Sequence, residues 1–298
     1  MPQAVRTAVF PVAGMGTRFV PATKSMPKEM LPLVDRPLIQ YAIDEAREAG
    51  ITDFIFVTAR GKSSLEDYFD SHYELEQALE EKGKDALLAE VRNSTMPSGA
   101  IAYIRQQEAL GLGHAVWCAR RLVGEQPFAV ILPDDVIKGP KGCMAQMVEA
   151  YEARGKGGCM VAAFDVPKDK ISAYGTLDIR EDNGAVVEVG GMVEKPKTEE
   201  APSNTAVIGR YILTPEVMRF LDRKETGAGG EIQLTDAIAA QVDAPGGVTG
   251  FRFQGRRYDC GSKQGFLQAT VAFALMREDL GAEFADFLRS LSAEDLAA

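Results

Sequence analysis

The sequence predicts an α/β fold, a Rossmann-like mixed, mostly parallel sheet flanked by helices, with an antiparallel elaboration. Three observations predict it. Apolar strand-like runs alternate with helical stretches through the first half of the chain, and closely spaced strands with short polar turns follow. The chain has 298 residues, of which 46% are hydrophobic and 26% charged, as in soluble globular proteins. This length suits one large domain or a core with one elaborated part.

The first half of the chain has the rhythm of strands joined by helices. Short β-branched apolar runs predict strands, and amphipathic stretches between them predict helices. The predicted strands are 7–12, 54–58, 100–104, 128–132 and 159–164, and the predicted helices are 38–49, 63–90, 113–123 and 143–154. Such alternation predicts parallel strands with helices covering both faces of the sheet.

The rhythm changes after Tyr174. Short polar turns such as Asp182-Asn183-Gly184 favour antiparallel pairing, so we expect an antiparallel insertion or a mixed edge of the sheet there. This part would carry the second half of a site. Strands are predicted at 176–179, 186–193, 207–213 and 248–253, and helices at 215–221, 231–240 and in the tail from 265 onward.

The charge of the chain limits its partners. A formal net charge of −10 repels phosphate polymers and anionic lipid, so we expect neither a nucleic acid nor a membrane partner. No run approaches the ~20 apolar residues of a transmembrane helix, and the start lacks a signal-peptide pattern, which predicts a cytoplasmic protein. Four scattered cysteines predict buried reduced thiols, namely Cys118, Cys143, Cys159 and Cys260.

The most informative segment follows the first predicted strand. It reads Ala13-Gly14-Met15-Gly16-Thr17-Arg18, and Pro27-Lys28-Glu29-Met30-Leu31-Pro32 comes shortly after. Glycines let backbone N–H groups approach an anion, and Arg18 and Lys28 supply local positive charge. It is neither a P-loop nor a dinucleotide fingerprint, since the third glycine position holds Phe19. The alternative is a glycine-rich turn with solvated cations.

This combination resembles the sugar-nucleotide pyrophosphorylase family, whose signature is a G-x-G-T-R loop followed by a P-K segment. The resemblance implies that a nucleotide binds at this loop. Backbone groups of Ala13, Gly14 and Gly16 would hold it, and Glu29 would help to fix its base end. Arg18 and Lys28 would then neutralise its phosphates.

A second segment suits recognition of a base. The run from Gln106 to His114 joins the third predicted strand to a helix, and an amide side chain offers both the donor and the acceptor that the imide edge of uracil requires. In the resembling family, Gln106 and the backbone near Gly111 read the base. The alternative for Gln106 is an exposed polar residue at a strand end. We interpret His114 as a cap or packing residue outside the chemistry.

Two carboxylates predict a metal site. Asp134 and Asp135 close a buried strand at the carboxyl edge of the sheet, where open α/β folds bind ligands, and hard oxygen ligands suit Mg²⁺. Asp134 would serve both metal and nucleotide. By resemblance, Asp259 is the second metal ligand, whereas Asp135 is not obligatory in the family pattern. The alternatives are a capping role for Asp134 and a turn role for Asp259.

Four short strings in the second half follow the order of the same family: 174–176, 193–196, 208–211 and 230–236. The resemblance implies a sugar phosphate site there. Gly175 and Gly209 would line the hexose, Glu194 would accept from sugar hydroxyls, Lys195 would bind the phosphate, and Glu231 would lie near the sugar. Read alone, residues 194–195 could be a solvated strand end, and Glu231 an acid that favours a helix dipole.

Within the family, three stretches are most similar to the bacterial UTP–glucose-1-phosphate uridylyltransferases: 27–32, 60–69 with the charged helix after it, and 230–236. The resemblance spans residues from about Thr7 to Gly261. It implies that UTP and glucose 1-phosphate form UDP-glucose and pyrophosphate by Mg²⁺-assisted in-line attack of the sugar phosphate on the α-phosphorus.

The resemblance also implies an organisation. A nucleotidyltransferase domain would cover 1–265, with a nucleotide-binding part at about 1–165 and a sugar phosphate-binding part at about 166–265, and a C-terminal helical segment would cover 266–298. A homodimer or homotetramer is expected. The alternatives are the same reaction with dTTP and a non-catalytic nucleotide-sugar sensor. The two cations and the two candidate metal acids argue against a sensor.

Overall fold

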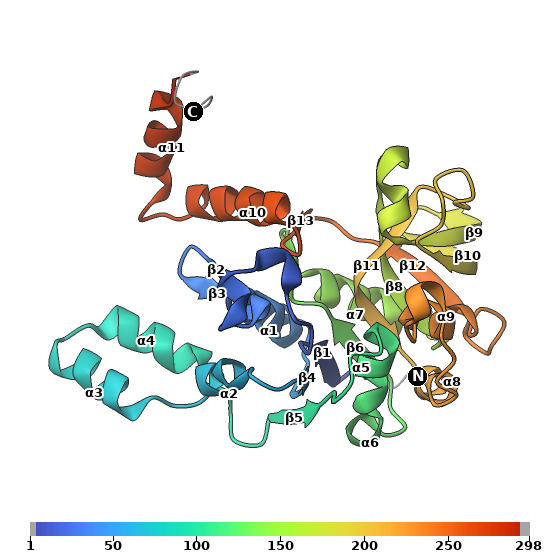
Figure 1. Cartoon of the computed structure of the whole chain (residues 1–298), viewed down its shortest axis with the longest axis horizontal. Coiled ribbons are helices and arrows are strands. Elements are labelled where there is room, and N and C mark those ends of the chain that lie inside the picture. The colour runs from blue at the N-terminus through green and yellow to red at the C-terminus, as the bar shows by residue number, and fades with distance from the viewer. Residues whose placement is uncertain (1–3, 293–298) are drawn as a thin grey trace.

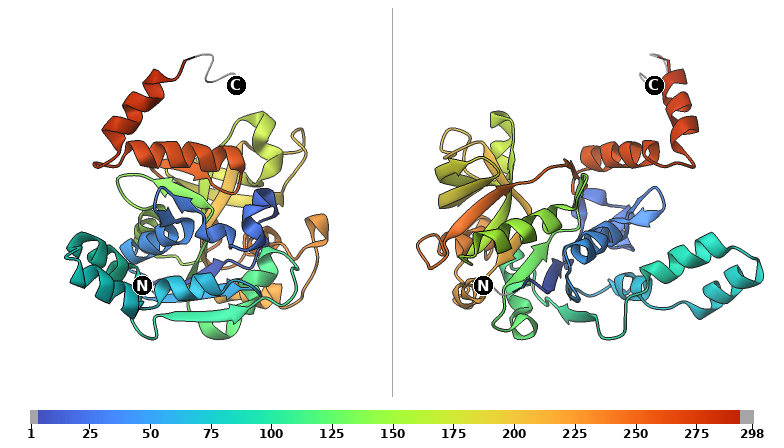
Figure 2. Two further views of the ribbon diagram at one scale, coloured as in Figure 1. Left: turned by 60° about the vertical axis from the view of Figure 1, so that its left-hand side comes forward. Right: turned by 180° about the vertical axis from the view of Figure 1, so that it is seen from behind.

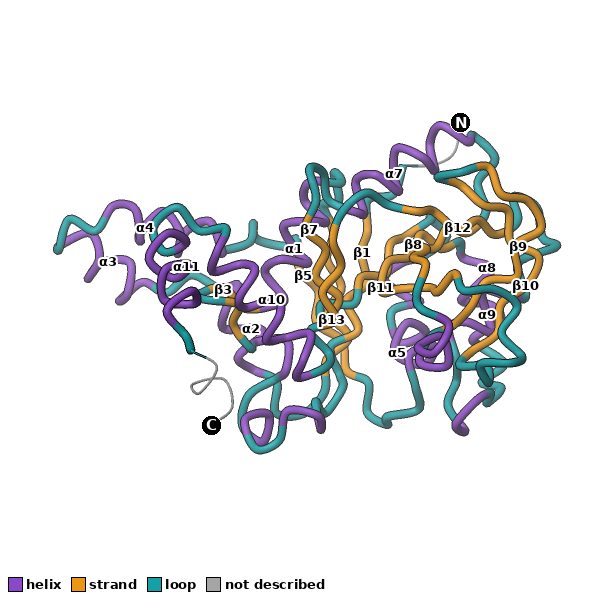
Figure 3. The backbone as a smooth tube through the Cα atoms, turned by 90° about the horizontal axis from the view of Figure 1, so that it is seen from above, coloured by secondary structure: helices purple, strands orange, loops and turns teal. Residues whose placement is uncertain are grey.

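The computed structural model describes residues 4–292. A nine-stranded mixed sheet forms its centre, and a long hairpin of helices and two C-terminal helices extend from it (Figures 1 and 3). The strands are β1 (Thr7–Pro11), β2 (Pro32–Leu33), β3 (Arg36–Pro37), β4 (Asp53–Thr58), β5 (Ile101–Arg105), β6 (Phe128–Ile131), β7 (Asp135–Lys138), β8 (Cys159–Asp165), β9 (Gly175–Asn183), β10 (Val186–Glu194), β11 (Thr205–Leu213), β12 (Val248–Arg252) and β13 (Arg256–Asp259).

The helices largely follow the predicted segments. They are α1 (Leu38–Glu48), α2 (Ser63–Phe69), α3 (Tyr73–Glu81), α4 (Asp85–Ser94), α5 (Leu112–Cys118), α6 (Arg120–Val123), α7 (Cys143–Arg154), α8 (Pro215–Leu221), α9 (Leu234–Ala239), α10 (Lys263–Leu275) and α11 (Gly281–Ser290). No helix in the described residues is long and apolar enough to cross a bilayer.

The strand order of the sheet is β5-β4-β1-β6-β11-β8-β12-β10-β9. The strands β5, β4, β1 and β6 are parallel neighbours, as the alternation predicts. The antiparallel strands do not all lie at an edge. The strands β9 and β10 form one edge of the sheet, whereas β11 runs antiparallel between β6 and β8 in the middle of the sheet. All nine of its residues are buried, which explains this central place.

Helices cover both faces of the sheet, as predicted. On one face of the sheet, a buried apolar cluster joins the strands to α5, α8 and α9. On the other face, a second cluster joins them to α1, α2 and α7. This arrangement leaves the loops after β1, β5 and β6 free at the carboxyl edge. These loops carry the segments that the sequence singled out. The division of the chain near residues 165 and 265 stays a prediction.

Two predicted helices are interrupted. The charged segment 63–90 forms α2, α3 and α4, because short polar stretches around Ser71 and Gly83 end each helix, and Gly83 takes a positive φ of 61°. The helices α3 and α4 project from the body as a hairpin (Figure 2). Segment 113–123 likewise divides into α5 and α6 at Ala119.

A two-stranded ribbon, β7 with β13, was not apparent from the sequence, because each strand has four residues and carries charges. Its register places Asp259 opposite Asp135. The ribbon therefore joins the segment that follows β6 to a segment near the C-terminus, and it brings the two stretches with candidate metal ligands side by side.

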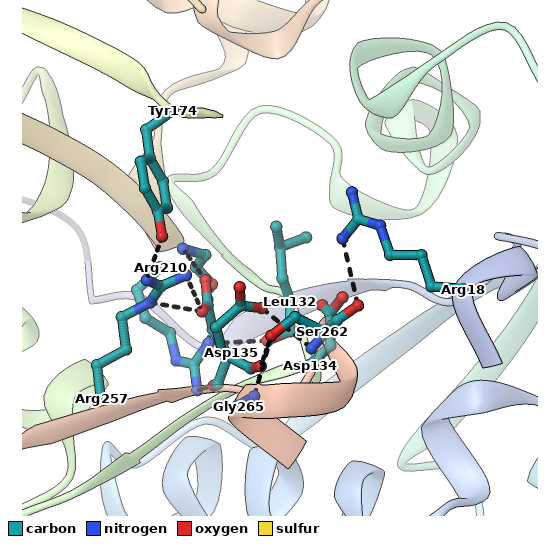
Figure 4. A network of polar contacts seen from close by, with 12 residues as sticks. Arg18, Leu132, Asp134, Asp135, Tyr174, Arg210, Arg257, Ser262 and Gly265 are labelled. Atoms are coloured by element: carbon teal, nitrogen blue, oxygen red, sulfur yellow. Dashed lines mark hydrogen bonds and ion pairs between the residues drawn. The ribbon is translucent and has the colours of Figure 1, made fainter. Parts of the chain in front are cut away.

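One buried ion pair fixes the start of this ribbon. Arg210 of β11 is 1% exposed, and its Nε and Nη2 donate to the two carboxylate oxygens of Glu45 in α1, both at 2.8 Å. It also donates to the carbonyls of Leu132 at 2.9 Å, Gly209 at 2.9 Å and Asp135 at 2.6 Å (Figure 4). These five bonds use every N–H of the guanidinium.

We expect Glu45→Ala to lower the free energy of unfolding by about 3–5 kcal/mol, because it leaves the charge of Arg210 buried without its counterion. Denaturation by urea measures this loss. Glu152→Ala, an exposed acid on α7, is the control and should change stability by less than about 0.5 kcal/mol. A loss for Glu45→Ala no larger than that of the control would contradict the prediction.

Candidate active site

The loop after β1 lines a cleft of about 550 Å³ together with the segments around Gln106, Asp134 and Gly261. Gly16 takes a left-handed conformation with φ 66°, and a Cβ there would lie 3.1 Å from the Cβ of Lys28. Gly16 is therefore a glycine for two reasons, its backbone angle and the close approach of the following loop. At Gly14 a Cβ would meet no atom within 4 Å, so this backbone borders open space.

Charged groups meet at one end of the cleft. The Nζ of Lys28 lies 2.6 Å from Oδ2 of Asp134, and Arg18 donates to the carbonyl of Gly261 at 3.2 Å. Oδ1 of Asp259 accepts from the backbone N–H of Gly261 at 3.1 Å. Both carboxylates approach one point, because a Cβ on Gly261 would lie 2.8 Å from Asp134 Oδ2 and 3.1 Å from Asp259 Oδ1.

Lys28 and Asp134 stabilise each other in the charged form. Burial raises the pKa of Asp134, but the ammonium of Lys28 outweighs this effect and holds that pKa below its usual range. Burial likewise opposes the charge of Lys28, and Asp134 outweighs it, so the pKa of Lys28 is raised. The pair is therefore ionised at neutral pH.

The carboxylates of Asp134 and Asp259 fit Mg²⁺ that takes its other ligands from phosphates and water. Within the described residues there is no group of three or more His, Cys, Asp or Glu side chains that could hold a metal alone. An ion at this point would thus depend on a bound phosphate ligand for much of its coordination.

The base end of the cleft lies between β5 and α5. Nε2 of Gln106 donates to the carbonyl of Gly111 at 3.2 Å and lies 3.0 Å from Nδ1 of His114. Gly111 has φ 104°, and a Cβ there would lie 2.8 Å from the Cβ of Glu231. Gln106, Gly111 and Glu231 all line the cleft. His114 is buried, and its Nδ1 contacts the amide of Gln106.

The residues expected at the sugar phosphate form a second group, on β9, β10 and α9. Glu194 accepts from Thr235 at 2.7 Å, and a Cβ on Gly175 would lie 3.0 Å from the same carboxylate. Lys195 Nζ lies 3.4 Å from Glu194, with its side chain 56% exposed and its backbone at φ 46°. The structure brings Gly175, Glu194 and Lys195 together, as predicted.

Arg257 connects the two groups, and the sequence reasoning did not assign it a role. It donates from Nε to Oδ1 of Asp135 at 2.6 Å and from Nη1 to the hydroxyl of Tyr174 at 3.1 Å (Figure 4). The backbone of Tyr174 accepts from Lys195 N at 3.1 Å. No local signal reveals the partners of Arg257, because both lie far away along the chain.

Asp135 has a structural place. Its Oδ2 accepts from Gly209 N at 2.9 Å, and its Oδ1 is paired with Arg257, so neither oxygen faces the cleft lining. Burial raises the pKa of this carboxyl, against the effect of Arg257. Protein groups thus hold both oxygens of Asp135, in keeping with the expectation that this residue is not an obligatory metal ligand.

Two expected site residues lie away from the cleft. Glu29 is 1% exposed and its carboxylate pairs with Lys62 at 2.9 Å, so it holds the turn that carries Lys28 and does not face the base end. Gly209 lies inside the sheet, and its N–H donates to Asp135 and its carbonyl accepts from Leu132 N. Internal hydrogen bonds thus use both backbone groups of Gly209, and its place beside the hexose stays a prediction.

The comparisons with known proteins agree with this geometry. The model of the nucleotidyl transferase family matches residues 8–274, which covers the cleft, the sheet and most of α10. The chain belongs to the nucleotidyl transferase family. Nucleotides carry negatively charged phosphates, and Arg18 and Lys28 supply positive charge at one end of the cleft.

Within the nucleotidyl transferases, the chain is similar to bacterial enzymes that share almost its whole length. It is 50% identical over 265 residues to the UTP–glucose-1-phosphate uridylyltransferase of Komagataeibacter xylinus, covering 88% of this chain and 92% of that enzyme. A solved structure of UTP-bound UGPase from Acinetobacter baumannii is 42% identical, with TM-score 0.87, covering 97% of this chain and all of that chain. A UDP-glucose pyrophosphorylase complexed with UDP-glucose is also 42% identical, with TM-score 0.81, over 92% and 100% of the two chains.

We expect Gly261→Ala to abolish the Mg²⁺-dependent part of nucleotide binding, because the methyl group would occupy the point that Asp134 and Asp259 both approach. Isothermal titration of UTP with and without Mg²⁺ measures this part. The control is Gly191→Ala on β10, where a Cβ would meet Asp178 at an ordinary 3.6 Å. Equal Mg²⁺ enhancement in wild type and Gly261→Ala would show that this point is not where the ion binds.

Proposed function

We propose that this protein transfers a uridylyl group from UTP to glucose 1-phosphate and so forms UDP-glucose and pyrophosphate. One observation carries the proposal. The carboxylates of Asp134 and Asp259 and the cations of Arg18 and Lys28 surround one end of the cleft that the loop after β1 lines, and the amide of Gln106 lies at its other end. The relatives that match nearly the whole chain are UTP–glucose-1-phosphate uridylyltransferases, which supports the same donor and acceptor here.

The reaction needs no general base. A phosphate monoester has a second pKa near ~6, so an oxygen of glucose 1-phosphate is already a nucleophile at neutral pH. It attacks the α-phosphorus of UTP in line, the new P–O bond forms as the bond to the β-phosphate oxygen breaks, and pyrophosphate leaves with the electron pair. The obstacle is the repulsion between two anions, so positioning and neutralisation of charge supply the catalysis.

The described residues supply that neutralisation. Arg18 and Lys28 lie where the triphosphate would leave the loop of Ala13, Gly14 and Gly16, and they would stabilise the departing pyrophosphate. Lys195 is exposed on its strand turn and would bind the incoming sugar phosphate, with Glu194 accepting from the hexose hydroxyls. Mg²⁺ held by Asp134 and Asp259 would supply Lewis-acid polarisation of the phosphates.

The test of the proposal is release of pyrophosphate by the purified protein with Mg²⁺ and glucose 1-phosphate, with UTP, dTTP, ATP, CTP and GTP compared in parallel. We expect release with UTP far ahead of the others. A preference for dTTP would assign the protein to thymidylyl transfer. Release with none of the donors, under conditions where the protein binds UTP, would favour a non-catalytic nucleotide-sugar sensor.

We also propose that the protein self-associates through its C-terminal helices. Figures 1 and 2 show α10 and α11 extending from the body. On α10, Leu267, Val271 and Leu275 recur every four residues, so they share one face, and they are 64%, 37% and 41% exposed. Phe287 of α11 is 55% exposed. A second copy of the chain would bury this apolar surface.

The cytoplasmic location stays a prediction.

Light scattering after gel filtration should give a multiple of the 32.2 kDa chain mass. The double change Leu267→Glu and Leu275→Glu should lower that mass to the monomer, because charges would be buried in the interface. Gln268→Glu, exposed on the same helix, should keep the oligomer. A monomeric wild type would rule out self-association, and an oligomer in the double variant would place the interface elsewhere.

A further inference from the structure

The amide of Gln106 has only one orientation in this structure, because of its two neighbours. The carbonyl of Gly111, 3.2 Å from Nε2, can only accept a hydrogen bond, so the atom facing it must be the nitrogen. The same nitrogen lies 3.0 Å from Nδ1 of His114. Both amide hydrogens are then used inside the protein, and Oε1 is the atom left for a ligand in the cleft.

The second of these bonds requires a neutral His114 whose Nδ1 carries no proton. The ring is 8% exposed, on α5, and it stacks on Trp117 with centroids 5.5 Å apart. Burial, and then the positive charge of Lys224 and Arg120, lowers the pKa of His114, with Glu108 opposing them. The imidazole is therefore neutral at neutral pH, and Nδ1 is an acceptor.

Residues on three sides give the ring this environment. Arg120 of α6 lies over one part of the Trp117 ring, 3.5 Å from its centroid, and Lys224 lies 4.5 Å from it. Both line a pocket of about 360 Å³ with His114, Arg105 and Glu108. Protonation of the imidazole would add a fourth positive charge to this pocket, which the surrounding charges oppose.

We propose that His114 is a positioning residue for donor-base selection: it fixes the amide of Gln106 so that only an acceptor faces the base. Uracil presents an N3–H donor to this oxygen. Cytosine has a lone pair at N3, which repels it, and would need the amide to turn. The inference rests on the proposed uridylyl transfer, since it concerns the choice among nucleotide donors.

His114→Phe keeps a ring of similar size in the buried site but removes the acceptor. One amide hydrogen of Gln106 then has no partner, and only the carbonyl of Gly111 still opposes the rotated amide that offers Nε2 to the base, so this rotation costs less than in the wild type. We expect the ratio of kcat/KM for UTP over CTP to fall by about tenfold or more, since one buried hydrogen bond gives discrimination of this size. His114→Leu should give the same change if the phenyl ring fails to fit.

A thymine donor supplies an internal control. dTTP carries the same N3–H and O4 as UTP, so the ratio for UTP over dTTP should stay within about twofold in both variants, whereas a general disturbance of the cleft would change it. Cys118→Ser is the matched variant. It lies on the same helix and lines the same pocket, but it is not a hydrogen-bond partner of the Gln106 amide, so it should keep the UTP over CTP ratio of the wild type.

The experiment measures pyrophosphate release with each donor, titrates UTP and CTP calorimetrically, and records circular dichroism of every variant. An unchanged UTP over CTP ratio in folded His114→Phe and His114→Leu would overturn the inference, as would equal falls in the UTP over CTP and UTP over dTTP ratios. If the wild type releases no pyrophosphate with UTP, the proposed function fails, and the ratio of UTP to CTP affinities still decides the role of His114.

Discussion

The guanidinium of Arg210 is the constraint on which the geometry of the cleft depends. It binds the carbonyls of Leu132 and Asp135, which stand on either side of the turn that presents Asp134. Its charge is in turn held by Glu45, which also accepts from the backbone of Met144. The pair of Arg210 and Glu45 thus joins helix α1, strand β11, the β6–β7 turn and the start of α7. A buried pair of this kind costs desolvation, so its benefit here lies in the position it fixes.

Asp135 extends this constraint toward the C-terminal part. Arg257 is hydrogen-bonded to Asp135 and to Tyr174, and the carbonyl of Tyr174 accepts from the backbone N–H of Lys195. The φ of Lys195 is 46°, a value that residues other than glycine rarely adopt. The lysine that would meet the sugar phosphate therefore sits on a strained turn, supported by the same network that shapes the metal end. Buried charges thus connect the end of the cleft near Asp134 to the group of Glu194 and Lys195, while the chain as a whole carries a negative net charge.

Local sequence was enough to predict most of the elements and to select residues that line one cleft, among them Gly14, Gln106 and Asp134. Apolar periodicity predicted the strands that become β1, β4, β5 and β6, and the order of short motifs located the residues around Gln106 and Asp134. It could not predict where β11 enters the sheet, because strand order depends on contacts far apart in the sequence. The partners of Glu29 and Gly209 could not be predicted for the same reason: Lys62 and Asp135 lie in other segments. Arg210 lies in the string 208–211 and Arg257 lies two residues before Asp259, but neither segment reveals the distant partners Glu45 and Asp135.

The ribbon of β7 and β13 has a consequence for how the protein is made. Its two strands are far apart along the chain, with Arg257 and its partner Asp135 separated by 122 residues. A nascent chain still lacking β13 can build the parallel strands around β1, yet it has no Asp259 beside Asp134 and no counterion for Asp135. Such long-range closure is slow relative to local helix and hairpin formation. The end of the cleft where Asp134 and Asp259 meet is therefore completed only after β13 has been made, and Arg18 gains its partner Gly261 at the same stage.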